Sequence, residues 1–316
     1  MRKLVFTVLL ISAVHIQSRA QSLLISELLY QPLSGEAEYV ELYNNSEHTI
    51  DLRYYKIIRW TGDSLGSIYH LPRYYLASHD YVVLTKDVLS VINNYDVKYI
   101  NKVIECNLPT YPNSGGRVIL ADVFVSPMGQ FFPGTASNII DSFDYSPSMQ
   151  SRLLRDKAGV ALERRSFERP TNEAGNWFSA ASTAGYGTPG YANSQSTEWL
   201  AEEASFVFSS SLISPDGDDY QDILEITYQL ENGDLSARVD LYDGRGTLMR
   251  RLLNNALLGT HGSLSWDGRG EGGRALPQGQ YIVQVTLYDT SGTLQVFRRA
   301  VAVITPPPLD NSISIT

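Results

Sequence analysis

The stretch LISELLYQPLSGEAEYVELYNNSEHTIDL, Leu24 to Leu52, decides the fold of this chain. It holds two runs of strand-forming residues on either side of a polar turn that contains Gly35. In the second run, YVELY from Tyr39 to Tyr43, aromatic and acidic residues alternate with valine and leucine. A period of two is typical of a strand whose two faces have different surroundings. We therefore predict a pair of strands, with Glu41 near a sheet edge, where it accepts hydrogen bonds from backbone amides.

The same rhythm of short strands and polar turns continues to about Gln195. The chain has 20 tyrosines, and aromatic side chains favour the half-buried surface of a sheet. One stretch, Lys86–Asp96, has apolar residues at helical spacing and predicts a short helix. The predicted strands of this part are Leu23–Leu29, Tyr39–Asn44, Lys56–Trp60, Tyr81–Thr85, Arg117–Ala121 and Ile139–Tyr145.

A second β-module is predicted from about Phe206 to Ile304, after a linker over residues 196–205. Its strands alternate cleanly, and two DGRG turns begin at Asp243 and Asp267. Short strands at regular spacing between such turns are typical of a β-sandwich. The residues predicted to face its core are Val239 and Leu241, Leu264 and Trp266, Val283, Val285 and Leu287, and Val301 and Val303.

Residues 1–20 have the composition of a secretory signal peptide. Arg2 and Lys3 precede the apolar run Leu4–Val14, and Ser18 and Ala20 stand where a signal peptidase reads small residues. We expect cleavage after Ala20 and a mature chain that begins at residue 21. No later run approaches 18 consecutive apolar residues, so no transmembrane helix is expected.

The charge balance argues against nucleic acid as a partner. The whole chain has a formal net charge of −9, with 25 basic and 34 acidic residues. Loss of Arg2, Lys3 and Arg19 with the leader leaves 22 basic residues and a charge of −12. A protein that binds along the phosphate backbone of a nucleic acid needs a basic face. An acidic balance instead suits an exported protein or the binding of divalent cations.

No catalytic motif stands out, and we predict that the protein is not an enzyme. Cys106 is the single cysteine, which excludes an intrachain disulfide and a CxxC metal site, and it is expected to be a small buried apolar residue. The histidines lack HxxxH or HExxH spacing, and His79-Asp80 is interpreted as a turn. Neither a Gly-x-Ser-x-Gly elbow nor a phosphate-binding loop occurs.

The acidic residues concentrate between Glu202 and Asp243, where 11 acids accompany one base, Arg238. Within this part, SPDGDDYQD spaces carboxylates around a glycine, and hard cations such as calcium take several oxygen ligands from turns of this kind. The candidate calcium ligands are Asp216, Asp218 and Asp222. The alternative is a solvated acidic turn that leads into a strand and holds no cofactor.

Residues 21–195 resemble a lamin tail domain of the type found in secreted bacterial proteins. The resemblance implies an immunoglobulin-like β-sandwich, in which Trp177 is a core residue and Gly187–Gly190 a loop that ends a strand. Most of its marked residues are then structural, and the alternative is a binding surface on exposed tyrosines such as Tyr54, Tyr55, Tyr74 and Tyr75. The pieces that carry the resemblance are Ile25–Pro32, Glu38–Leu52, Asn113–Asp122, Ile140–Ser146 and Ala161–Ser194, with residues 123–138 as an added surface loop.

The second module, residues 206–304, resembles the FlgD-type immunoglobulin-like domain and the C-terminal sorting domains of the type IX secretion system of Bacteroidetes. The matching pieces are Ile213–Asp222, Val239–Leu252 and Ser265–Val285. The last piece is the most specific, because a tryptophan leads into a DG turn, a glycine-rich turn and LPQGQY at the start of a strand. Residues 305–316, TPPPLDNSISIT, are expected to form an extended tail.

The predicted protein is therefore all-β, with two immunoglobulin-like β-sandwich domains in tandem. We expect an exported, non-enzymatic structural or interaction protein of the periplasm, outer membrane or cell surface, with an envelope protein or a glycan as its partner. One alternative is a component or client of the type IX machinery, in contact with an outer-membrane translocon. A second alternative is the accessory binding module of a secreted hydrolase.

Overall fold

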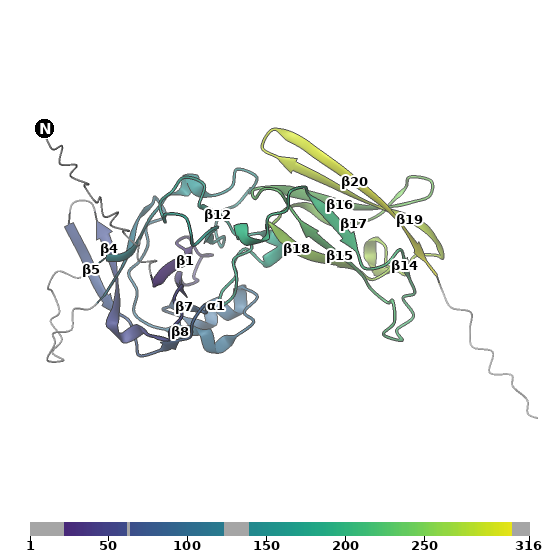
Figure 1. The fold of residues 1–316 in the computed structure, drawn as a ribbon. Helices are drawn as coiled ribbons and strands as arrows, with labels where there is room; N and C mark the ends of the chain where they lie inside the picture. The colour runs from purple at the N-terminus through teal and green to yellow at the C-terminus, as the bar shows by residue number, and fades with distance from the viewer. Residues whose placement is uncertain (1–21, 62–63, 123–138, 305–316) are drawn as a thin grey trace, which may run out of the picture.

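The structure, a computed structural model, describes residues 22–61, 64–122 and 139–304. Over these residues the chain is all-β, with five sheets and one α-helix, α1 (Val88–Asn94) (Figure 1). The predicted leader, the added loop at 123–138 and the tail at 305–316 lie outside the described residues. Six short 3₁₀ helices join the strands: η1 (Leu52–Tyr54), η2 (Ile100–Lys102), η3 (Pro147–Met149), η4 (Ser182–Ala184), η5 (Thr197–Trp199) and η6 (Glu271–Gly273).

The larger sheet of the first sandwich has six strands. Its pairs are antiparallel except the last, β7 (Tyr81–Thr85) with β8 (Val103–Glu105), where the chain crosses over through α1 and η2 to return in parallel. In spatial order the strands are β12 (Trp177–Ser179), β11 (Leu162–Arg164), β1 (Leu23–Leu29), β2 (Tyr39–Asn44), β7 (Tyr81–Thr85) and β8 (Val103–Glu105).

The second sheet of this sandwich packs on one face of the first. Its strands, in spatial order, are β10 (Ile139–Tyr145), β9 (Gly116–Asp122), β4 (Tyr55–Thr61) and β5 (Ser64–His70). The core between the sheets contains Trp177, whose ring stacks on Phe143 with 3.6 Å between centroids. A short ladder of β3 (Ile50–Asp51) with β6 (Tyr75–Leu76) closes one end. The predicted role of Trp177 in the core is confirmed.

The predicted strands of the first module are confirmed, four of them to the residue. Strands β4 and β9 are each one residue longer at both ends than expected. The helix is shorter, because Asp87 caps it by accepting hydrogen bonds from the amides of Leu89 and Ser90. The strands absent from the prediction are β3, β5, β6, β8, β11 and β12, of which only β5 is longer than three residues.

Two further sheets form the second sandwich. One has the order β13 (Ser205–Phe208), β15 (Leu224–Gln229) and β18 (His261–Trp266). The other has the order β14 (Leu212–Ile213), β20 (Gly292–Val303), β19 (Gly279–Asp289), β16 (Ser236–Asp243) and β17 (Leu248–Leu257). The residues predicted to face inward are all buried except Leu264, which is half-buried and packs against the core.

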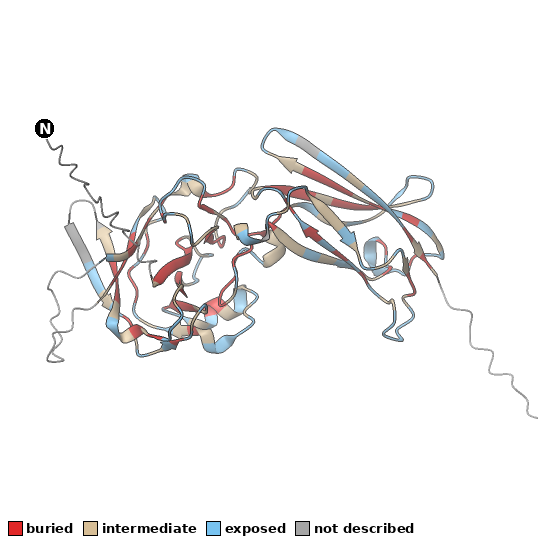
Figure 2. Cartoon of the chain, viewed as in Figure 1, coloured by how far each residue is buried: buried red, intermediate tan, exposed pale blue. Residues whose placement is uncertain are grey.

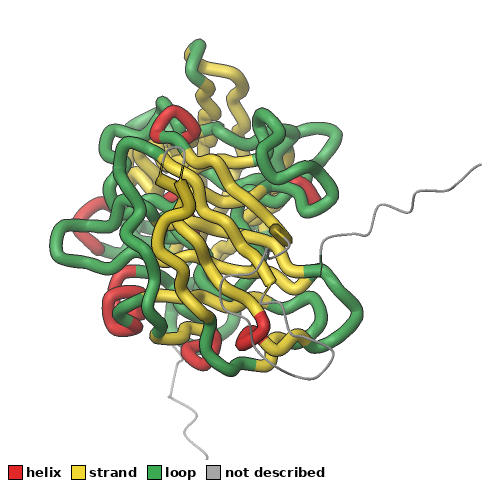
Figure 3. Tube along the Cα trace, turned by 90° about the vertical axis from the view of Figure 1, so that its left-hand side faces the viewer, coloured by secondary structure: helices red, strands yellow, loops and turns green. Residues whose placement is uncertain are grey.

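Buried residues follow the strands of both sandwiches (Figure 2). Seen from the side of the first sandwich, the strands gather in the middle and the loops surround them (Figure 3). One core draws on residues between 23 and 177 and another on residues between 213 and 303. The predicted fold class, all-β with immunoglobulin-like sandwiches, is confirmed, while the module boundaries stay a prediction.

Candidate functional site

The predicted calcium ligands lie on a turn between β14 and β15. Hydrogen bonds within the turn hold its shape. The side-chain carboxylate of Asp222 accepts from the backbone amides of Gly217 (2.8 Å) and Asp219 (2.9 Å). Gly217, Asp219 and Gln221 have φ values of 85°, 67° and 57°, so the chain bends through the left-handed region three times. These bends turn the carboxylates toward a common side.

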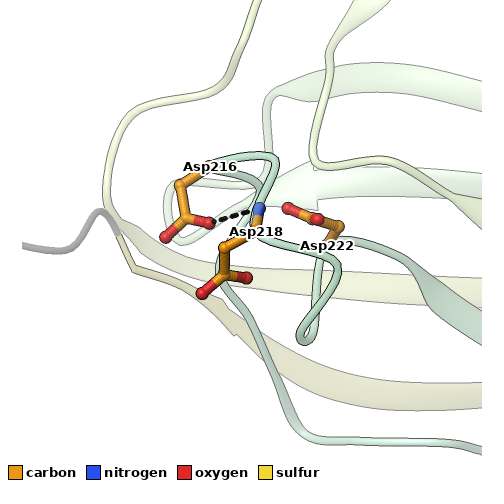
Figure 4. Close-up of side chains that lie close together, drawn as sticks. All are labelled: Asp216, Asp218 and Asp222. Atoms are coloured by element: carbon orange, nitrogen blue, oxygen red, sulfur yellow. Dashed lines mark hydrogen bonds between the residues drawn. The ribbon is translucent and has the colours of Figure 1, made fainter.

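The turn brings the three predicted ligands together, as Figure 4 shows. One carboxylate oxygen from each of Asp216, Asp218 and Asp222 lies within 4.8 Å of the other two. Asp216 and Asp218 are exposed, and the Asp218 amide donates to the carboxylate of Asp216 at 3.2 Å. Oxygen ligands in such a group suit calcium, but the internal hydrogen bonds already account for the shape of the turn. Calcium binding therefore stays a prediction.

A second candidate is an exposed group at the end of the first sandwich, here called the Arg–Tyr surface: Arg53, Tyr54, Arg73 and Tyr75. The strand pairing of β3 with β6 sets Tyr75 directly opposite Asp51. The Arg53 guanidinium lies 4.8 Å from the centre of the Tyr54 ring, and that of Arg73 lies 5.3 Å from the centre of the Tyr75 ring. Tyr54 is 37% exposed and Tyr75 is 57% exposed, which makes this a surface of paired cations and aromatic residues.

The hydrogen bonds of the Arg–Tyr surface hold its side chains in place. Arg73 Nε donates to the Tyr75 hydroxyl at 3.1 Å, and an Arg53 Nη donates to the Tyr54 hydroxyl at 3.0 Å. Arg53 also pairs with Asp51 at 2.9 Å. Preformed side chains lose less entropy when a partner binds.

The four tyrosines suggested as a binding surface divide into two pairs. Tyr54 and Tyr75 are exposed, whereas Tyr55 and Tyr74 turn inward and pack against the core of the first sandwich. The two pairs lie at element boundaries, since Tyr54 ends η1 and Tyr55 begins β4, while Tyr74 precedes β6 and Tyr75 begins it. The expectation is thus wrong for Tyr55 and Tyr74.

The third candidate is a row of three buried glutamates across the centre of the six-stranded sheet. Glu27 on β1 is paired directly with Glu163 on β11 and with Glu41 on β2. All three have 0% exposure. A bulge at Ser26 shifts the register of β1, so that Ile25 faces the core while Glu27 joins the opposite face. Like charges directly opposite each other destabilise a sheet, so this glutamate row needs compensating contacts.

Those contacts come from residues 180–196, here called the closing segment, which cover the glutamate row. The amide of Gly190 donates to Glu41 Oε2 at 2.7 Å, and the amide of Thr188 donates to Glu27 at 3.2 Å. Ser194 Oγ donates to Glu163 Oε2 at 2.7 Å. The closing segment therefore holds the row through hydrogen bonds from its own amides and hydroxyls, without a buried lysine or arginine among the described partners of the carboxyls.

Burial and mutual repulsion raise the pKa values of the row. The pKa of Glu27 rises to about 8, chiefly because burial penalises its charge and then because Glu163 lies opposite. Burial, followed by the charge of Glu27, holds the pKa of Glu41 well above its usual range. The pKa of Glu163 is also raised by burial, with the Ser194 and Thr188 hydrogen bonds opposing the shift.

Two expectations about these residues are corrected by the structure. Glu41 does accept a backbone amide, but β2 lies inside the sheet and not at its edge. The loop Gly187–Gly190 does not end a strand, because β12 ends at Ser179 and the loop crosses the face of the sheet. Each glutamate of the row has a leucine beside it in its strand (Leu28, Leu42 and Leu162), a pattern that period-two alternation alone treats as an exposed face.

The remaining candidates have structural surroundings. Cys106 is half-buried against the first core, and burial raises the pKa of its thiol to about 11. His79 lies in an exposed turn, as expected, with Nδ1 3.1 Å from the Tyr43 hydroxyl and Nε2 3.2 Å from Glu47. These contacts do not form a nucleophilic triad.

Comparison with known proteins supports part of the sequence interpretation. The family model of the lamin tail domain matches residues 16–146. That range ends before β11, β12 and the closing segment, which complete the same sandwich. The lamin tail domain has an immunoglobulin-like fold that is typically non-catalytic. Among curated proteins, no sequence matches this chain.

The structural matches are distant. FlgD from Pseudomonas aeruginosa is 20% identical over 33% of this chain and 70% of its own, with a TM-score of 0.22. The soluble domain of PmoD from Methylocystis is 17% identical over 33% of this chain and 94% of its own, also with a TM-score of 0.22. Latent PorU from Porphyromonas gingivalis is 9% identical over 90% of this chain and 34% of its own, with a TM-score of 0.27. Scores this low carry no argument about function.

Within the described ranges, no helix has the length and apolar character needed to cross a membrane.

Proposed function

We propose that this chain is an exported, non-enzymatic interaction protein, and that its Arg–Tyr surface binds an acidic segment of another protein. The match to a lamin tail domain and the all-β fold support the general class. The observation that carries the proposal is the pair of exposed tyrosine rings with an arginine over each. Tyrosine and arginine are the residue types that most often dominate binding energy at interfaces.

The arrangement favours an acidic protein over a neutral glycan. A sugar ring stacks on the face of a tyrosine, and a guanidinium group lies on one side of each ring here. A carboxylate can instead approach the free edges of the guanidinium groups while the rings stay in place, and arginine binds carboxylates in a planar, two-point geometry. The two arginines and Asp51, which pairs with Arg53, sum to a charge of +1 on a chain whose overall charge is negative.

The test is capture of partners from envelope extracts of the source cells with the full mature chain. The variant Arg73→Ala/Tyr75→Ala removes one cation–ring pair. Loss of a central aromatic or arginine contact costs about 2 kcal/mol, so we expect roughly a 30-fold loss of affinity for the captured protein. Binding should also weaken as salt rises, because ionic contacts are screened.

Arg117→Ala is the matched control, because Arg117 is an exposed arginine on β9 that pairs with Asp144 on β10. The proposal requires that this control keep its binding. Equal capture by the wild type and by the Arg73→Ala/Tyr75→Ala variant would refute it, and capture of a neutral glycan in place of an acidic protein would refute the choice of partner.

Export and the role of the second module belong to the same proposal. The basic start, apolar run and small residues of positions 1–20 support secretion through a cleaved leader. The alternative is a component or client of the type IX machinery, supported by the resemblance of residues 265–285. Removal of residues 206–316 should block export or mislocalise the protein under that alternative, whereas unchanged export would argue against it.

Calcium binding at Asp216, Asp218 and Asp222 is a separate proposal, supported by the convergence of their carboxylates. Isothermal titration of the mature chain with calcium chloride tests it. Heat of binding that is lost in Asp218→Asn would support the proposal, and the absence of binding by the wild type at millimolar calcium would end it.

A further inference from the structure

Hydrogen-bond geometry around Thr188 indicates that the glutamate row holds a proton. The Thr188 hydroxyl lies 3.0 Å from Glu27 Oε2 and 2.9 Å from Glu163 Oε1. A hydroxyl has one proton to donate, and an ionised carboxylate can only accept. If both carboxyls were ionised, one of these two contacts would place acceptor against acceptor. One of the two carboxyls must therefore donate its own proton to the Thr188 oxygen.

Glu41 points to the same conclusion. Its Oε2 accepts from the Gly190 amide, while its Oε1 is fully buried; the Ser26 hydroxyl is the other polar group at this carboxyl, and its proton is donated to Asn193 Oδ1 at 3.2 Å. A buried carboxylate charge with an oxygen left unpaired is strongly penalised. The three carboxyls do not converge closely enough to form a metal-binding group of the kind seen at the acidic turn. A bound proton relieves the charge without the need for such a group.

The surroundings of the row add no opposing charge at its centre. Four phenols pack around it, and five charged groups lie at the margin. On the sheet side, the direct neighbours in the row are Phe178 and Val83. The titratable and charged groups that face it are Tyr39 on β2, Tyr81 on β7, Tyr95 after α1, Tyr191 in the closing segment, Lys98, Lys102, Asp80 and Asp96 around the loop of η2, and Arg165 beside Phe178.

The closing segment also carries the contacts between the two sandwiches. Ser182 Oγ donates to the carbonyl oxygen of Leu257 at 2.8 Å, and Thr183 Oγ1 lies 2.9 Å from the Tyr228 hydroxyl. The amide of Thr260 donates to the carbonyl oxygen of Ser194 at 2.8 Å. Ser194 thus contacts Glu163 with its hydroxyl and the second sandwich with its carbonyl. A movement of this segment off the glutamate row would disturb the joint between the sandwiches.

We propose that the glutamate row and the closing segment form a proton-dependent latch. In the closed state the row holds at least one proton, the segment lies on the sheet, and the joint to the second sandwich is fixed. Loss of the proton places adjacent negative charges in the buried row, and the segment lifts to let water reach them. The latch thereby links the pH of the surroundings to the freedom of the second sandwich.

The direction of the pH dependence follows from the raised pKa values. The pKa of Glu27 rises from 4.5 to about 8 in the folded chain, so the folded chain binds more protons than the unfolded chain between these values. The free energy of unfolding then falls as pH rises through this window. The stabilising contribution of the proton is complete below about pH 4.5 and is lost above about pH 8.

The test uses the full mature chain in the presence of EDTA, at pH values from 5 to 9.5. Glu27→Gln replaces the carboxyl with a neutral group of the same shape that still donates a hydrogen bond. Glu105→Gln is the control, because Glu105 is an exposed carboxyl on β8 of the same sheet. The readouts are the Tm and the amide exchange of Gly190 and Thr260, each divided by its intrinsic rate at that pH.

We expect the Tm of the wild type and of Glu105→Gln to fall by more than about 5 °C between pH 5 and 9. Protection of the Gly190 and Thr260 amides should fall together by at least about tenfold. In Glu27→Gln both effects should be much smaller. Infrared spectra of the wild type should show a protonated carboxyl at pH 7 that disappears by pH 9.5, a readout that does not depend on how any variant folds.

Three results would overturn the latch. Parallel Tm curves for the wild type and Glu27→Gln would show that Glu27 does not carry the pH dependence. Absence of a protonated carboxyl at pH 7 would remove its basis. A Tm that EDTA lowers and calcium restores in the wild type but not in Glu27→Gln would identify a buried cation in place of the proton.

Discussion

Arg164 and Asp141 form a buried ion pair on the core side of the first sandwich. Each of the two side chains is 1% exposed. The two charges lie 3.1 Å apart. Asp141 also accepts a hydrogen bond from the Ile25 amide at 2.9 Å and one from the Thr171 hydroxyl. A buried charge is tolerated when its partner and its hydrogen bonds are all present, and here one aspartate joins β1 to the segment from Arg164 to Thr171.

Asp141→Ala should therefore lower the free energy of unfolding of the first sandwich by about 3–5 kcal/mol, because it leaves the Arg164 charge buried and unpaired. Asp144→Ala is the matched control on the same strand, since the Asp144–Arg117 pair is 44% exposed at each end. Asp144→Ala should lower the free energy of unfolding by at most about 1 kcal/mol. Urea unfolding of both variants measures the difference, and similar losses would contradict this account of the buried pair.

Sequence alone predicted which apolar residues are buried but not which polar residues are. Val239, Val283 and Val301 follow the simple alternation of a strand and were placed correctly. Glu27 and Glu163 occupy equally buried positions, yet no local pattern separates a buried glutamate from an exposed one. Their burial depends on a segment that reaches them from 25 to 161 residues away.

At the scale of elements, the closing segment fits the sheet through a glycine. A Cβ atom at Gly187 would lie 2.6 Å from the Tyr39 hydroxyl oxygen and 2.8 Å from a ring carbon of Tyr95. Such distances are too short for any carbon contact, so the segment approaches the sheet closely only because this position has no side chain. Close packing over the glutamate row therefore requires glycine at position 187, the first residue of the GTPGYANS stretch.

Gly187→Ala should destabilise the first sandwich by about 1–3 kcal/mol through this overpacking. Gly279→Ala is the control, because a Cβ there meets only one atom, at an ordinary 3.9 Å. The change at Gly279 should alter the Tm by little. Scanning calorimetry gives both values, and an unchanged Tm in Gly187→Ala would show that the segment does not press on the sheet as described.

Strand prediction succeeded for the long strands of the first module, apart from β5, and failed for the strands of two or three residues. Strands β1 and β2 form a hairpin in which Leu23 is paired with Asn44 and Leu29 with Tyr39. Both strands lie in one continuous stretch, and its pattern predicts them. Strands β11 and β12 have three residues each, and β11 pairs with β1 across more than 130 residues of chain. Three residues give too short a pattern to recognise, and the sheet edge that they fill is set by tertiary packing.

At the scale of the whole molecule, the joint between the sandwiches is held at Gly259. A Cβ atom there would lie 2.4 Å from the carbonyl oxygen of Ser194. The neighbouring Thr260 amide donates to that same oxygen. Close approach of the two backbones at this point fixes the contact between the closing segment and the second sandwich.

Gly259→Ala should loosen the joint while both sandwiches stay folded. We expect faster amide exchange at Thr260, by at least about tenfold, with little change in the strands of either core. Gly244→Ala is the control in the second sandwich, since a Cβ there meets no atom within 4 Å. If exchange at Thr260 were the same in both variants, the joint would not depend on this contact.

The central claim is that the Arg–Tyr surface binds an acidic protein, and site-specific photo-crosslinking in the source cells tests it most directly. A photoreactive phenylalanine is placed at Tyr75 and, as the control, at Tyr220, which is 69% exposed on the acidic turn. The account predicts that position 75 yields one dominant protein adduct, through an acidic segment, that position 220 does not yield. No adduct at position 75, or the same adducts at both positions, would contradict it.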